Sequence, residues 1–118
     1  MVVGSDAPEG TVLWQGGLYI LEDGLDPVRI TDDSLRPLLA FPAINPQPET
    51  RWTEDGRVLF VAERQGESFV YQARVDGSGT KTVWGGSLQA SALTLDRSAG
   101  RAVTTASSPG SPSDLYQV

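Results

Sequence analysis

The sequence has no histidine and no cysteine among its 118 residues. A Ser-His-Asp or Cys-His nucleophilic site needs an imidazole that takes and returns a proton near neutral pH, so this chain has neither kind of site. Histidine-ligated metals, thiolate zinc sites and disulfides are excluded because their side chains are missing. We therefore expect no catalytic, cofactor-binding or metal-binding residue in this chain.

Basic charge and long apolar runs are also scarce. Fifteen acidic residues stand against nine basic ones, which gives a net charge of −6, and the eight arginines and one lysine are scattered singly. Nucleic acid and anionic membrane surfaces are poor partners for such a chain. No segment has the apolar length that spans a bilayer, and residues 1–6 lack the basic start and apolar core of a signal peptide. The sequence predicts a cytoplasmic protein.

What the sequence does have is a run of short strand patterns between residues 51 and 86. Apolar stretches at 57–62, 69–75 and 81–84 are rich in branched and aromatic side chains. Turn dipeptides separate them, namely Asp55-Gly56, Gln65-Gly66 and Asp76-Gly77. With residues 51–54 before Asp55-Gly56 as the first strand, the stretch predicts four short antiparallel strands in a row, a β-meander with two faces to cover.

The flanking segments predict further strands. Before the meander we expect a lead-in over residues 1–10, then a hairpin of strands 11–14 and 18–22 with its turn at 15–17, and a third strand at 28–31. Residues 35–39 predict one helical turn that Pro37 limits, within a connector over 34–48. After the meander, strands are expected at 90–95, 101–106 and 113–118, with a turn at 96–100 and a loop at 107–112.

These pieces repeat weakly. Tyr19, Tyr71 and Tyr116 follow one another at spacings of 52 and 45 residues, and Gly56 and Gly100 lie 44 apart in matching turns. A period of about 40–50 residues with four strands per unit is typical of propeller blades, which stack because one sheet cannot cover its own faces. We predict an all-β partial β-propeller of antiparallel four-stranded meander repeats over 11–118, about two and a half to three blades. Its units would be approximately 11–33, 49–86 and 90–118. An unrelated β-sandwich stays open as an alternative.

The residues also resemble a known family. Residues 52–62, WTEDGRVLFVA, resemble the blade repeat in propellers of the prolyl oligopeptidase family and of the periplasmic Tol-system proteins. The tail sequences RAVTTASSP at 101–109 and SPSDLY at 111–116 look like the last propeller blade of acylaminoacyl-peptidase-like members. Two departures are Glu54, where the repeat usually has proline, and Ala99-Gly100, which replaces Asp-Gly.

The resemblance implies a non-catalytic propeller portion of a serine peptidase. In that family the propeller restricts the access of peptides to an α/β-hydrolase domain, which is absent from this chain, so the chain alone is expected to be inactive. The expected partners are that hydrolase domain or further copies of this chain, because three blades cannot close a ring and leave open faces. The alternative is a stand-alone β-meander module for protein binding or self-assembly.

Several motifs come close to an active site without completing one. Gly85-Gly86-Ser87-Leu88-Gln89 fails G-x-S-x-G at its last position, and no helix pattern follows it. Ser78 and Lys81 fit S-x-x-K but lie in a glycine-rich turn, where Gly77-Ser78-Gly79 also lacks the helix that a phosphate cradle needs. We interpret all of these segments as turns.

Acidic and aromatic groups allow a functional and a structural interpretation. Three acidic groups fall at predicted turns without calcium-loop spacing, which favours carboxylates that accept backbone N–H bonds. They are Glu22-Asp23 with Asp26, Asp32-Asp33, and Glu54-Asp55. Five aromatic residues could line a ligand groove, but their place in apolar strands favours packing between blades. They are Trp14, Trp52, Phe60, Phe69 and Trp84.

Overall fold

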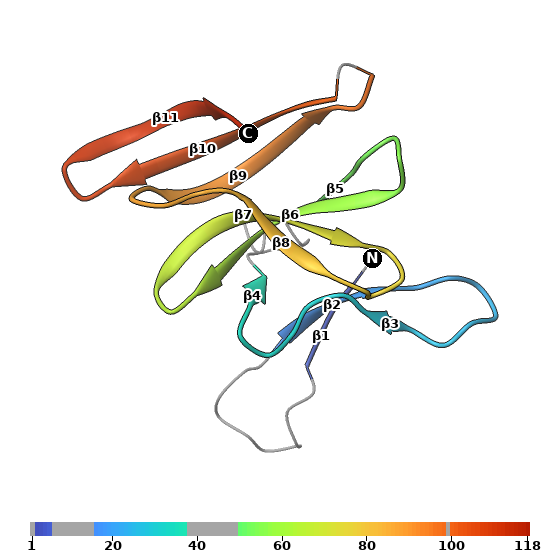
Figure 1. The fold of residues 1–118 in the computed structure, drawn as a ribbon. Helices are drawn as coiled ribbons and strands as arrows, with labels where there is room; N and C mark the ends of the chain where they lie inside the picture. Colours follow the sequence, from blue (N-terminus) through green and yellow to red (C-terminus); the bar gives the residue numbers. More distant parts are fainter. Residues whose placement is uncertain (1, 6–15, 38–49, 99) are drawn as a thin grey trace.

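The described residues of the protein form a stack of three antiparallel β-sheets (Figure 1). The computed structural model describes residues 2–5, 16–37, 50–98 and 100–118, and over these residues it contains strands and turns but no helix. The sheets lie one above another in the order of the sequence, with the N-terminal sheet lowest in the view of Figure 1. The prediction of an all-β fold built from antiparallel meander sheets is confirmed.

Each sheet comes from one continuous part of the sequence. The N-terminal sheet has the order β1-β2-β3, with β1 at Val2–Ser5, β2 at Gly16–Ile20 and β3 at Val28–Arg29. The middle sheet contains β4 (Arg36–Pro37), β5 (Thr50–Trp52), β6 (Arg57–Arg64), β7 (Glu67–Arg74) and β8 (Thr80–Trp84). The C-terminal sheet has the order β11-β10-β9, with β9 at Gln89–Asp96, β10 at Arg101–Ser108 and β11 at Ser111–Gln117.

The predicted central meander is confirmed as β5-β6-β7-β8. Its hairpins turn at glycines with positive φ, 78° at Gly56, 85° at Gly66 and 74° at Gly77, conformations that side chains with a Cβ rarely adopt. Gln65 shares the β6–β7 turn at φ 54°, so both residues of this two-residue loop are left-handed, as a type I′ turn requires. The loop length fixes the register, in which Arg64 pairs with Glu67 and Arg57 pairs with Arg74.

Strands β6 and β7 of the middle sheet are buried on both faces, which explains why the β6 sequence is a continuous apolar run. Side chains alternate between the faces of a sheet. On β6, Val58, Phe60 and Ala62 belong to the core shared with the N-terminal sheet, whereas Leu59 and Val61 belong to the core shared with the C-terminal sheet.

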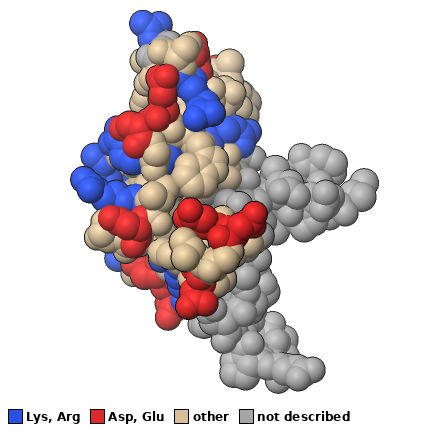
Figure 2. Space-filling model, turned by 90° about the vertical axis from the view of Figure 1, so that its right-hand side faces the viewer, with Lys and Arg blue, Asp and Glu red and all other residues tan. Residues whose placement is uncertain are grey.

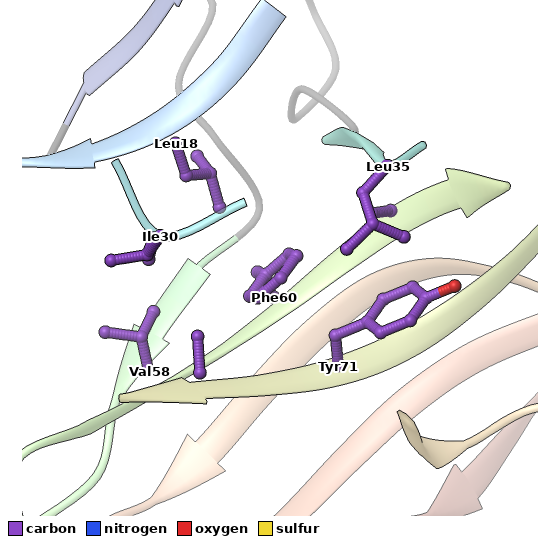
Figure 3. Close-up of a cluster of buried hydrophobic side chains, with 8 residues drawn as sticks. Leu18, Ile30, Leu35, Val58, Phe60 and Tyr71 are labelled. Atoms are coloured by element: carbon purple, nitrogen blue, oxygen red, sulfur yellow. The ribbon is translucent and has the colours of Figure 1, made fainter. Parts of the chain in front are cut away.

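Each core joins two sheets through a small set of side chains. In the first core, Phe60 stacks on Tyr71 with ring centroids 5.6 Å apart, and Leu18, Ile30 and Leu35 point toward them from the N-terminal side (Figure 3). The second core packs strands β6 and β7 against buried residues of β9 and β10. Those residues are Ala90, Leu93 and Ala102.

Three expectations for the first 37 residues are wrong. Residues 2–5 of the expected lead-in form strand β1, which pairs with β2. Gly16 and Gly17 lie within β2 rather than in a turn. A Cβ at Gly17 would lie 2.7 Å from Arg29 Nε, so the glycine allows the Arg29 side chain to pack against the β2 backbone. Arg36 and Pro37 form the short strand β4 on β6 instead of a helical turn. The expected strand at 11–14 and the connector beyond Pro37 lie outside the described residues.

The later predictions differ only at strand ends. The expected strand at 28–31 is shorter, since β3 ends at Arg29. The expected loop at 107–112 is reduced to a turn at Pro109 and Gly110, because β10 extends to Ser108 and β11 begins at Ser111.

We expect Phe60→Ala to lower the free energy of unfolding by about 3–5 kcal/mol, because it leaves a cavity in the first core and removes the stacking on Tyr71. Val83→Ala is the control, since Val83 is 37% exposed and its truncation should cost less than about 1 kcal/mol. Urea unfolding followed by tryptophan fluorescence measures both. Equal costs for the two variants would contradict this assignment of the core.

Candidate functional site

The middle and C-terminal sheets repeat the same strand register. In the middle sheet Phe60 pairs with Tyr71 across β6 and β7, and in the C-terminal sheet Thr104 pairs with Tyr116 across β10 and β11. The turns that precede β6 and β10 each contain a glycine of positive φ, 78° at Gly56 and 63° at Gly100. The sequence repeat of tyrosine and glycine therefore corresponds to an equivalent arrangement in space.

Both tyrosines face the preceding sheet. Tyr71 lies in the core shared with the N-terminal sheet, and the Tyr116 ring lies 5.4 Å from the ring of Trp84 in the middle sheet. Tyr19 alternates with Leu18 and therefore faces away from the middle sheet, with the Arg29 guanidinium 5.9 Å above its ring. The three tyrosines thus share one orientation in the stack.

The residue before each tyrosine faces the following sheet. Leu18 and Val70 occupy this position in the first two sheets, and both are fully buried by the sheet that follows. Leu115 occupies it in the C-terminal sheet and is 69% exposed. The described residues contain no further sheet on that side, so a position that is core in two sheets is open in the third.

Leu115 belongs to an uncharged surface that we call the outer C-terminal face. Val103 and Thr105 of β10 form its centre, because they alternate with the buried residues Ala102, Thr104 and Ala106. The strand pairing adds two neighbours from β9 and two from β11. The outer C-terminal face consists of Ala92, Thr94, Val103, Thr105, Leu115 and Gln117. None of these side chains carries a charge.

The segments that partly match the G-x-S-x-G and S-x-x-K motifs lie at turns, as predicted. Ser87 is exposed in the bend between β8 and β9, and strand β9 follows it where a nucleophile elbow needs a helix. Ser78 lies in the β7–β8 turn, where its N–H donates to Asp76 Oδ1 at 2.9 Å. Lys81 lies on strand β8, so no helical turn brings it to the Ser78 hydroxyl.

In the acidic groups at 32–33 and 54–55, Asp32 and Asp55 accept hydrogen bonds within turns, as predicted, whereas Asp33 forms an ion pair with Arg29. Asp32 accepts the Ser34 N–H at 2.8 Å, and the hydrogen bond from the Ser34 hydroxyl leads the effects that lower the pKa of the Asp32 carboxyl. Asp55 accepts the Thr53 hydroxyl at 2.5 Å and forms an ion pair with Arg57. Across the described parts of the chain, acidic residues form no group of three that fits a metal ion.

The aromatic residues divide between packing and surface. Phe60, Phe69 and Tyr71 pack together, with the Phe69 and Tyr71 rings 6.1 Å apart, and Trp84 contacts Tyr116. Trp52 is 39% exposed on β5. Packing between sheets is therefore confirmed for Phe60, Phe69 and Trp84, whereas Trp14 lies outside the described residues. No helix in the described ranges has the length and apolar character that crossing a membrane requires.

We expect the purified chain to hydrolyse neither acyl-peptide nor peptide substrates at any pH, because it has no imidazole and Ser87 lies in an open bend. A fluorogenic acyl-peptide assay of the wild type beside Ser87→Ala measures this. Reproducible turnover that the substitution abolishes would contradict the expectation.

Asp55 should make stability depend on acid pH. The hydrogen bonds from Arg57 and Thr53 lower the pKa of this carboxyl from its ordinary 3.8 to about 2. A depressed native pKa contributes stability above the unfolded pKa and loses it as pH falls through the native one. We expect Asp55→Asn to destabilise the protein at pH 7, with the difference from wild type shrinking between about pH 4 and pH 2. Urea unfolding across this range measures it, and Glu54→Gln is the control with the same charge change. A difference independent of pH would refute the expectation.

Comparison with known proteins finds no match for this chain among family models, curated proteins or solved structures. The resemblance to oligopeptidase propellers therefore rests on the repeat residues alone, and the feature that bears on function is the outer C-terminal face.

Proposed function

We propose that this chain is a non-catalytic propeller segment that works by packing sheet against sheet, as part of an oligopeptidase-like serine hydrolase in which it restricts the access of peptides. The occupant proposed for the outer C-terminal face is a further antiparallel sheet of the same kind. Propellers contain about four to eight sheets, and the described residues supply three.

The exposure of Leu115 carries the proposal. The equivalent residues Leu18 and Val70 are apolar and are buried by the next sheet. An isolated surface strand has no such requirement, yet the third position is again a large apolar residue. The same reasoning applies to Val103, which occupies on β10 the place that Leu59 has on β6.

A second candidate is self-assembly, in which another copy of this chain covers the outer C-terminal face. The six residues of this face carry no charge, which favours self-assembly. Covering the face with another copy would leave no ionised group buried without a partner. The coding sequence after residue 118 separates the two candidates. A G-x-S-x-G motif with a later histidine there supports the hydrolase segment, and its absence supports the self-assembling module.

The solution mass of the chain tests the packing proposal. A monomer has a mass of 12.6 kDa, and we expect light scattering over a concentration series to show a discrete larger species. Leu115→Glu should return the mass to the monomer, because a buried carboxylate at the new interface is costly. Leu25→Glu is the matched control, since Leu25 is 65% exposed in the β2–β3 loop. A cooperative monomer at all concentrations would overturn both candidates, since a complete small fold needs no covering sheet.

A further inference from the structure

A cavity of about 290 Å³ lies at one end of the middle sheet, away from the outer C-terminal face. Strands β6, β7 and β8 and the β7–β8 turn contribute its walls. The polar side chains around it include Arg57, Gln72, Arg74 and Lys81. Three of the nine basic residues of this acidic chain therefore line one cavity.

Strand register brings these side chains together. Arg57 lies directly opposite Arg74, and Gln72 lies directly opposite Lys81. By the alternation along each strand, all four share the face that carries Val61 and Val70. The C-terminal sheet covers the apolar part of this face, and the cavity lies at its polar end.

This arrangement costs stability that nearby carboxylates offset in part, since Asp55 pairs with Arg57 and, beside the hydrogen bonds from Ser78, the charge of Arg74 helps lower the pKa of the Asp76 carboxyl. Like charges directly opposite each other on antiparallel strands repel. Arg57 has one counter-charge, the carboxylate of Asp55. Within the described part of the chain, neither Arg74 nor Lys81 forms an ion pair. Figure 2 shows that basic and acidic side chains lie next to one another on this side of the molecule.

A buried donor at the cavity points to the same conclusion. Arg57 Nε is buried and no described group accepts a hydrogen bond from it. A buried N–H without an acceptor costs free energy, and an arginine N–H is satisfied best by an oxyanion. Asp55 binds the guanidinium through a terminal nitrogen, Nη2, and an anion in the cavity reaches Nε only if the Arg57 side chain turns, because this atom has no surface open to it.

We propose that this cavity binds a small oxyanion, a phosphate or carboxylate group, held by Arg57, Arg74 and Lys81. The arginines supply planar pairs of N–H donors and the lysine supplies a point charge, while the Gln72 amide offers a neutral donor. No helix N-terminus takes part, so the site differs from a glycine-loop phosphate cradle. Asp55 and Asp76 line the adjoining hollow and repel extended polyanions, which restricts the ligand to a small group.

Anion titration tests the proposal, which does not depend on the proposed function. Inorganic phosphate should bind saturably in calorimetry and raise Tm beyond sodium chloride of equal ionic strength. Arg74→Gln should weaken binding about tenfold, since it removes one charge-assisted contact. It should unfold no more easily than wild type in chloride, because it also removes the repulsion with Arg57. Lys81→Gln should weaken binding in the same direction.

Arg64→Gln is the matched control. Arg64 is an exposed arginine at the end of β6 that lies opposite to Arg57, so the charge change is the same as in Arg74→Gln but the cavity is untouched. Unchanged phosphate affinity in this variant supports the site. Equal weakening by Arg64→Gln and Arg74→Gln, or equal Tm shifts with phosphate and chloride, would overturn it, because both indicate general charge screening.

A parallel titration with succinate identifies the ligand class. Tighter phosphate binding that depends on Arg74 assigns the cavity to phosphate groups, and tighter succinate binding with the same dependence assigns it to carboxylates. Absence of saturable binding by either anion would refute the site.

Discussion

The burial of strands β6 and β7 on both faces of the middle sheet is the constraint on which the rest of the structure depends. Strand β6 sends Val58, Phe60 and Ala62 into one core and Leu59 and Val61 into the other, so one strand anchors both neighbouring sheets. Burial on both faces needs apolar side chains at successive positions of a strand. An antiparallel sheet with one solvated face has them only at every second position. Because neither outer sheet has a core of its own, each is stable only against this strand and its partner β7.

The two cores meet this constraint with different side chains. At equivalent places in the register, the first core has the large ring of Phe60 and the second has Thr104. Thr104 is fully buried, and its hydroxyl donates to the Ala92 carbonyl oxygen at 2.7 Å, which satisfies the polar group. The contact of Trp84 with Tyr116 supplies the aromatic packing between these two sheets. The repeat therefore conserves the register while it exchanges the side chains that fill each junction.

Local turn chemistry made the central strands predictable, and non-local pairing made others unpredictable. Asp-Gly and Gln-Gly turns mark the ends of β6 and β7 in the sequence. Strands β1 and β4, in contrast, exist only because they pair with strands that lie further along the chain. Gly17 looked like a turn because its close approach to Arg29 leaves no local signal. The basic residues looked scattered for the same reason. A two-residue loop at Gln65-Gly66 nevertheless implies that Arg57 pairs with Arg74, so the register carried a signal for the cavity.

The open face and the cationic cavity lie on corresponding faces of two successive sheets. On the middle sheet, the face toward the next sheet is apolar at Val61 and Val70 and ends in the cation Arg57. On the C-terminal sheet, the corresponding face has Thr105 and Leu115 and ends in Arg101, which follows Gly100 as Arg57 follows Gly56. A sheet that packed on the outer C-terminal face in the same way would cover Leu115 and leave Arg101 at the rim. Arg101 lies directly opposite Asp96, whereas Arg57 lies opposite Arg74, so such a junction would repeat the apolar centre while its edge would carry both charges.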